Sequence, residues 1–115
     1  MRKKNINDVN YLDNKPIRNS EINWSTDAEG KVTLEIENKG VANRIAQKLI
    51  RKPKISYIHL DEMGSFIWPL IDGEKTIADI SVFVKEHFGE NAEPLYERLA
   101  KFIKILESYK FISLK

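Results

Sequence analysis

The segment 31–37 limits the possible folds most strongly, because its apolar and polar residues alternate without a break. Its sequence, KVTLEIE, places Val32, Leu34 and Ile36 on one side and polar residues on the other. Strict alternation over this length is typical of a half-buried β-strand. Residues 21–25 (EINWS) alternate as well, and the turn residues TDAEG lie between the two segments. We therefore expect a β-hairpin with one apolar side.

The hydrophobic period changes from two to nearly four in the segment 41–52. In VANRIAQKLIRK, the residues Val41, Ile45 and Leu49 are four apart, which predicts an amphipathic helix with a basic opposite side. Residues 55–60 (ISYIHL) then read as a third strand with apolar residues on both of its sides. The expected sheet thus has three antiparallel strands, with an extra helix between the second and the third.

Three helices are expected after the third strand, and local signals mark their ends. Asp61 is suited to cap the first helix, and Pro69 should shorten it before an Asp-Gly turn. Gly64 is costly inside a helix, so a neighbouring group should pack close to it. Thr76 opens the second helix and resembles the start of a capping box, with Asp79 in place of glutamate. The third helix carries an apolar stripe formed by Leu95, Leu99, Phe102, Leu106 and Tyr109.

These elements predict an α+β fold of winged-helix type, in which a small three-stranded antiparallel sheet packs on a three-helix bundle. A short apolar strand, FISL at residues 111–114, should follow the last helix. Residues 1–15 are polar and are expected to form a flexible N-terminal arm, so that a single domain spans residues 16–115. The basic start has no apolar run after it and no stretch is long enough to cross a membrane, which favours a cytoplasmic protein.

The sequence offers little that could support catalysis or hold a cofactor. It contains no cysteine, which excludes disulfides and thiolate zinc sites. Its two histidines, His59 and His87, have no partner at metal-ligand spacing. Asp61 and Asp72 are better explained as helix-end residues than as paired catalytic carboxylates. Since glycine-rich phosphate loops and nucleophile motifs are also missing, we expect no enzyme activity, no metal and no cofactor.

Charge is unevenly distributed along the chain, although the formal net charge is only +2. Residues 39–54 carry six basic residues and no acid, whereas residues 61–97 carry nine acids against two lysines. Such asymmetry can mark a binding surface or only two solvated sides. One hypothesis is a winged-helix regulator that contacts duplex DNA through basic residues of the third helix, namely Arg98, Lys101 and Lys104. The acidic residues before them would repel phosphate, so we do not expect a nucleic-acid partner.

The second hypothesis is peptide binding at the edge of the sheet. The third strand forms that edge, and no charged residue or proline within it blocks pairing with another chain. An apolar edge strand beside an amphipathic helix makes a groove, to which an extended peptide can add as a further strand. The alternative is that the N-terminal arm or another copy of the chain covers this edge, so a homodimer stays open.

Residues 60–80, LDEMGSFIWPLIDGEKTIADI, together with the HFG that follows and the terminal FISL, resemble the PqqD family of peptide chaperones. The same fold is known as the RiPP recognition element, where RiPP means ribosomally made, post-translationally modified peptide. The resemblance covers roughly residues 16–114. It implies a protein without catalytic activity, which binds the leader segment of a precursor peptide between its third strand and its third helix. It also implies a partner that modifies the peptide, often a radical S-adenosylmethionine protein.

The open edge and the resemblance together give a set of candidate residues. The peptide-binding candidates are Ile55, Tyr57, Ile58 and His59 on the strand and Arg98, Leu99, Phe102 and Ile105 on the helix. The helix at 41–52 departs from the family pattern, since a simple member has a short turn there. It either covers the core with its apolar side or docks a partner through the basic residues Arg44, Lys48 and Arg51.

Overall fold

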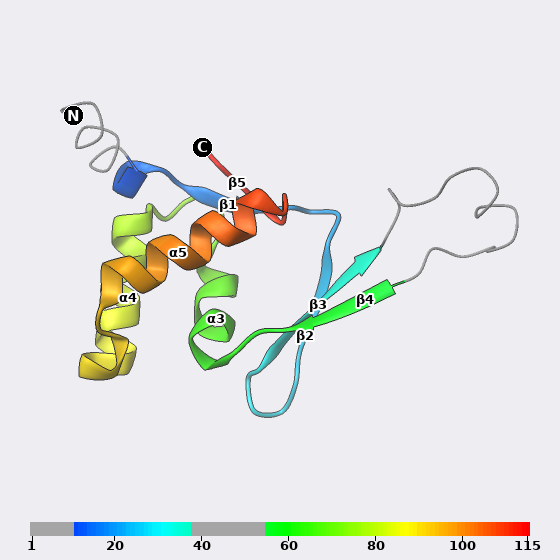
Figure 1. The fold of residues 1–115 in the computed structure, drawn as a ribbon, viewed down its shortest axis with the longest axis horizontal. Coiled ribbons are helices and arrows are strands. Elements are labelled where there is room, and N and C mark those ends of the chain that lie inside the picture. The colour runs from blue at the N-terminus through cyan, green and yellow to red at the C-terminus, as the bar shows by residue number, and fades with distance from the viewer. Residues whose placement is uncertain (1–10, 38–54) are drawn as a thin grey trace, which may run out of the picture.

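A computed structural model describes residues 11–37 and 55–115 of the chain. Its elements are β1 (Pro16–Arg18), β2 (Asn23–Thr26), β3 (Val32–Glu37), β4 (Ile55–His59), α3 (Glu62–Ile67), η1 (Trp68–Leu70), α4 (Ile77–Phe88), η2 (Gly89–Ala92), α5 (Leu95–Ser108) and β5 (Ile112–Leu114). Figure 1 shows the helices gathered at one end of the molecule and the three-stranded sheet at the other. The expected α+β class is confirmed, whereas the helix expected at 41–52 lies outside the described residues.

The strands β2, β3 and β4 form the expected antiparallel sheet, with β3 in the middle. Leu34 of β3 lies opposite Trp24 on one side and Ile58 on the other. Val32 and Leu34 are buried, while Thr33 between them is only half-buried. The alternation in KVTLEIE therefore reports a strand with its apolar side on the core.

The core lies between this side of the sheet and the helices. Trp68 is the largest fully buried side chain, and its ring meets Trp24 edge-on at 6.3 Å between centroids. Apolar residues from every helix join it, including Ile67, Ile71, Ile77, Ile80, Val84, Leu99, Ile103 and Leu106. Burial of this apolar surface is the main force that holds the sheet on the helices.

The expected helix ends are confirmed. The carboxylate of Asp61 accepts a hydrogen bond from the Gly64 N–H at 2.7 Å, which caps α3. Pro69 lies in the 3₁₀ turn that follows this short helix. Thr76 and Asp79 form a complete capping box at the start of α4.

Gly64 has the close neighbour that its position in a helix led us to expect. A Cβ atom added there would lie 3.2 Å from two ring carbons of Phe102 and 3.0 Å from the capping oxygen of Asp61. Phe102 therefore packs directly on the backbone of α3, which fixes the distance between α5 and the end of β4.

The apolar stripe predicted for α5 is wrong at one position. Tyr109 is 65% exposed and stacks on Phe111, whereas Ile103, which the stripe omitted, is fully buried. The reason is that the buried side of α5 is centred on Leu99, Ile103 and Leu106. Tyr109 lies just past the helix end at Ser108, on the more exposed flank one turn after Ile105.

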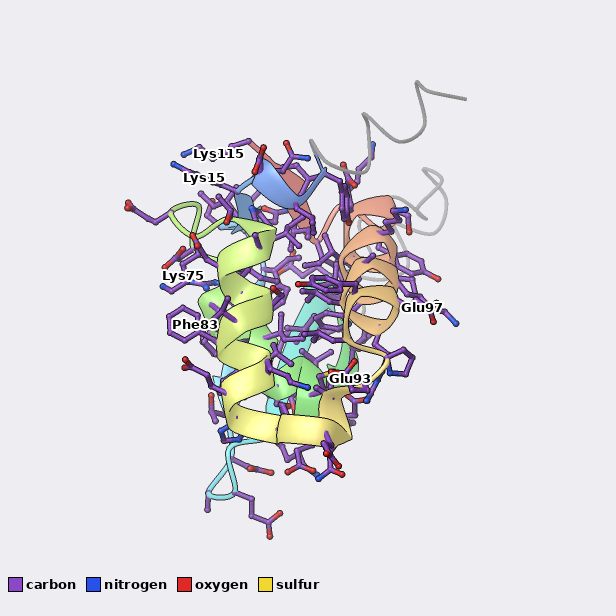
Figure 2. All side chains as sticks on the ribbon, turned by 90° about the vertical axis from the view of Figure 1, so that its left-hand side faces the viewer. Lys15, Lys75, Phe83, Glu93, Glu97 and Lys115 are labelled. Atoms are coloured by element: carbon purple, nitrogen blue, oxygen red, sulfur yellow. The ribbon has the colours of Figure 1, made fainter. Side chains whose placement is uncertain are left out.

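A short strand that the sequence did not reveal, β1, pairs antiparallel with β5. The backbones of Lys15 and Lys115 exchange two hydrogen bonds, and Figure 2 shows these two residues beside each other. The segment also pairs with the loop before α4, since the Gly73 N–H donates to Pro16 and the Ile77 N–H donates to Asn14. These residues thus join the C-terminal end to the centre of the chain.

Arg18 strengthens the same junction. Its guanidinium donates to three backbone carbonyls at the end of η1, those of Trp68, Pro69 and Ile71, at 2.9–3.2 Å. It also lies 5.4 Å from the ring centre of Trp24, in cation–π geometry. One side chain therefore adds hydrogen bonds to the carbonyls at this helix end and connects β1 to the sheet.

Candidate functional site

The outer edge of β4 has no strand beside it among the described residues 11–37 and 55–115. The Leu60 N–H donates to the Val32 carbonyl at 2.9 Å, which shows how the strand is oriented. Residues two apart in an antiparallel pair point their backbone groups to the same neighbour. The N–H and C=O groups of Ile55, Tyr57 and His59 therefore point to the open edge.

The side chains of the same three residues lie on the solvent side of the sheet. Tyr57 is 59% exposed and lies opposite Glu35, while Ile55 is also exposed and lies opposite Glu37. His59 is held in place because its Nδ1 lies 2.9 Å from the Thr33 hydroxyl. Exposed aromatic and aliphatic side chains on an edge strand make this side of β4 a candidate surface for binding another chain.

Ile58 is the one strand candidate on the opposite side of β4. It is half-buried, lies opposite Leu34 and packs against the core. This position places it on the side of the sheet that faces the helices. A strand added at the edge would place alternate side chains next to Ile58 and next to Tyr57.

The Ser65 hydroxyl fixes β4 relative to α3. It accepts a hydrogen bond from the Val32 N–H at 2.8 Å and donates to the Leu60 carbonyl at 3.2 Å. The hydroxyl thus replaces one rung of the ladder between β3 and the end of β4. The sequence alone gives no sign of this role, because Val32 lies 33 positions away in the chain.

We expect the substitution Ser65→Ala to destabilise the domain by about 1–3 kcal/mol, since it leaves the buried Val32 N–H without a partner. Unfolding in urea measures this change. Ser81→Ala is the matched control, because Ser81 is also buried but donates only to the Ala78 carbonyl of its own helix. Equal losses in the two variants would contradict the bridging role of Ser65.

The four helix candidates differ in their positions on α5. Ile105 is 45% exposed, and Phe102 is half-buried against Gly64. Leu99 is fully buried in the core, so it supports the surface from beneath and cannot line it. The Arg98 guanidinium donates to the Asn91 carbonyl at 2.8 Å, which holds it at the η2 end of the helix.

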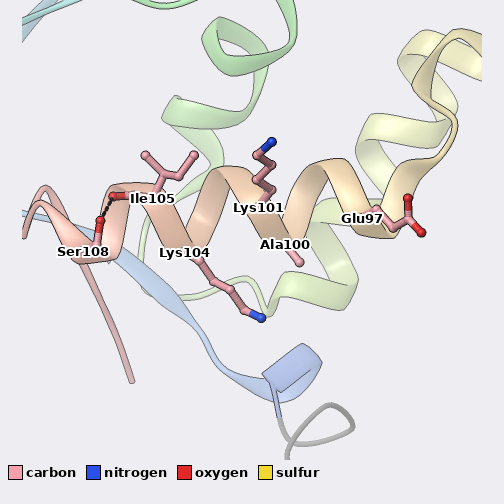
Figure 3. A pocket seen from close by; sticks show the side chains of 6 residues that line it. All are labelled: Glu97, Ala100, Lys101, Lys104, Ile105 and Ser108. Atoms are coloured by element: carbon pink, nitrogen blue, oxygen red, sulfur yellow. Dashed lines mark hydrogen bonds between the residues drawn. The ribbon is translucent and has the colours of Figure 1, made fainter.

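A shallow hollow of about 480 Å³ runs along the exposed surface of α5. It is lined by Glu97, Ala100, Lys101, Lys104, Ile105 and Ser108. In Figure 3, Lys101 and Ile105 point to one side of the helix, and Ala100 and Lys104 point to the other. The hollow thus combines the apolar side chains of Ala100 and Ile105 with two lysines and one glutamate.

The perturbed titrating groups have structural causes. The pKa of Asp72 is lowered because its carboxylate accepts a hydrogen bond from Lys75 Nζ at 2.8 Å and others from backbone N–H groups. Burial, together with the charge of Glu107, raises the pKa of Tyr11 to about 12. No group of histidines and carboxylates in the described residues is arranged to hold a metal ion. No helix in this part of the chain is long and apolar enough to cross a membrane.

The residues expected to dock a partner, Arg44, Lys48 and Arg51, lie outside the described residues.

Comparison with known protein families finds a match to the family described as coenzyme PQQ synthesis protein D (PqqD), over residues 34–112. This range begins in β3 and ends in β5. Searches of curated proteins and of solved structures found no match.

Proposed function

Because the chain belongs to the PqqD family, we propose that it is a peptide chaperone without catalytic activity of its own. Membership indicates a role in the synthesis of coenzyme PQQ or of another product made from a ribosomal peptide. In our proposal, the protein binds the leader segment of a precursor peptide and presents it to a modifying enzyme, such as a radical S-adenosylmethionine protein. It works in the cytoplasm and needs no cofactor.

The open edge of β4 is the observation that carries this proposal. The leader adds there as a strand, and its backbone pairs with the outward N–H and C=O groups of Ile55, Tyr57 and His59. Its alternate side chains lie beside Tyr57 on the solvent side and beside Ile58 on the helix side. Phe102 and Ile105 supply the apolar wall on α5. Backbone pairing gives affinity, and these side chains select the sequence and its register.

We also propose that the sheet and helices adopt the winged-helix-like arrangement of the RiPP recognition element, in which the third strand and the third helix flank the peptide. In this protein those elements are β4 and α5. Gly64 and Phe102 support the proposal, because they keep α5 close to the end of β4. The joint between β4 and α3 is then the scaffold of the groove.

The proposal is tested by titration calorimetry with a synthetic leader. Light crosslinking of the tagged protein in its native host, followed by purification and mass spectrometry, identifies the precursor peptide from which this leader is made. We expect Tyr57→Ala and Ile105→Asp each to weaken binding about tenfold, since each removes an exposed apolar contact. Because both side chains are exposed, neither variant should change the unfolding curve.

Arg98→Glu serves as the comparison within the same helix. The Arg98 guanidinium donates to the Asn91 carbonyl, so reversing its charge should weaken binding less than Ile105→Asp does. Unchanged affinity in both Tyr57→Ala and Ile105→Asp would exclude this groove as the binding site. An Arg98→Glu effect larger than that of Ile105→Asp would move the site toward the start of α5.

A further inference from the structure

Two adjacent large apolar residues, Val82 and Phe83, are exposed on α4. Their exposed fractions are 55% and 41%. The opposite side of the same helix, with Ile77, Ile80 and Val84, is fully buried. The helix is further fixed by its capping box. The pair is therefore held on a rigid element, and it does not belong to the peptide groove.

Acidic residues surround this pair. Asp79 and Glu86 precede and follow it by about one helical turn, so they lie on the same side of α4. We call Asp79, Val82, Phe83 and Glu86 the α4 face. Further acids, Glu74 and Glu90, are exposed at the two ends of the helix.

The nearby lysines do little to neutralise this charge. Lys75 forms an ion pair with Asp72 at 2.8 Å, and its Nζ lies 5.9 Å from the ring centre of Phe83. Lys85 forms an ion pair with Glu93. Each lysine is thus already matched by a carboxylate outside the α4 face, which leaves the face itself negative.

The position of the α4 face separates it from the edge of the sheet. In Figure 1, α3 lies between α4 and the three-stranded sheet. Figure 2 looks onto α4 and shows Phe83 pointing outward, away from the body of the domain. A protein bound at the α4 face would therefore leave β4 free to hold a peptide.

Charge also decides between the occupants of this face. A second copy docked through a two-fold axis would bring two copies of the same negative face together, because such an interface uses the same surface twice. Like charges brought together in this way oppose association. A different protein with basic residues around an apolar centre has no such penalty, and its charge would speed and orient the encounter.

We propose that the α4 face docks a folded protein whose contact surface has an apolar centre edged by lysines and arginines. The identity of that protein rests on the proposed function: it is the enzyme that modifies the bound peptide. The chain then has two separate surfaces, the β4 edge for the peptide and the α4 face for the enzyme.

The test places the photocrosslinking amino acid p-benzoylphenylalanine at Phe83 in the full chain, expressed in its native host. Tyr57 and Glu29, which lies exposed in the turn between β2 and β3, receive the same residue in separate variants. We expect Phe83 to crosslink one folded protein at a lysine- and arginine-rich surface, Tyr57 to crosslink a short peptide, and Glu29 to crosslink neither. Crosslinks from Phe83 to another copy of this chain, or none above the level at Glu29, would overturn the proposal.

The crosslinked protein is then purified and titrated with the unlabelled chain. We expect Phe83→Glu to weaken this binding at least tenfold and to leave the affinity for the leader peptide unchanged. Tyr96→Glu is the matched control, since Tyr96 is also an exposed aromatic residue but lies on α5. Equal affinities for Phe83→Glu and the original chain would refute the α4 face. If Phe83→Glu weakens binding of the crosslinked protein while no peptide binds at β4, the α4 face is supported as a docking surface and the proposed chaperone function is refuted.

Discussion

Replacing Tyr57 by proline is expected to weaken binding of the leader peptide at least about 30-fold while the domain stays folded. The Tyr57 N–H points to the open edge of β4, so its loss breaks no hydrogen bond between β3 and β4. An added strand would lose a donor at the centre of its ladder and would meet the proline ring. We expect a loss of at least about 2 kcal/mol, or about 30-fold in affinity, by titration calorimetry.

Two other substitutions separate this backbone effect from loss of the Tyr57 side chain and from unfolding of the sheet. Tyr57→Val removes the same side chain but keeps the N–H, so it should bind more tightly than Tyr57→Pro. Ile58→Pro removes an N–H that faces β3, and it should therefore unfold the sheet. If Tyr57→Pro and Tyr57→Val bind the leader equally well, the peptide does not add to β4 as a strand.

Removal of β1 is expected to have the largest effect on stability. A chain that begins at Asn19 lacks the partners of β5 and of the loop before α4, and it loses the three carbonyl contacts of Arg18. It also lacks Pro16, which is fully buried in the intact domain. We expect more than about 5 kcal/mol to be lost, which is the whole stability of many domains.

The matched control begins at Lys15 and keeps β1. The two chains differ by four residues, so the difference between their unfolding curves in urea isolates the contribution of the strand. Circular dichroism should show a cooperative transition for the longer chain and none for the shorter one. A cooperative transition of similar midpoint in both chains would mean that β1 contributes little to folding.

The sequence predicted the elements whose signals are local. The alternation in KVTLEIE, the cap at Asp61 and the capping box at Thr76 each involve residues within a few positions of one another, and each is found in the structure. The edge of β4, which has no further strand beside it among the described residues, was likewise suggested by ISYIHL, because the relevant feature is the absence of charge within one short segment. The match to the PqqD family agrees with the resemblance carried by residues 60–80.

The features that escaped prediction depend on residues far apart in the chain. β1 has only three residues and no alternation long enough to detect, and its partner β5 lies at the other end of the sequence. Ser65 matters because its hydroxyl meets β3, 33 positions away. Arg18 looks like an ordinary charged residue in the sequence, because the carbonyls that it contacts near η1 lie about 50 positions away. The exposure of Tyr109 follows from its place just past the end of α5, on the flank that also exposes Ile105.

The pairing of Lys15 with Lys115 has a practical consequence for protein engineering. Residues paired in this way lie about 5.5 Å apart between their Cα atoms, so the two ends of residues 15–115 leave the domain side by side. A unit with adjacent ends can be inserted into a surface loop of a host protein without spreading that loop. The segment 15–115 is therefore suited to insertion into other proteins, with the paired strands β1 and β5 at the two junctions.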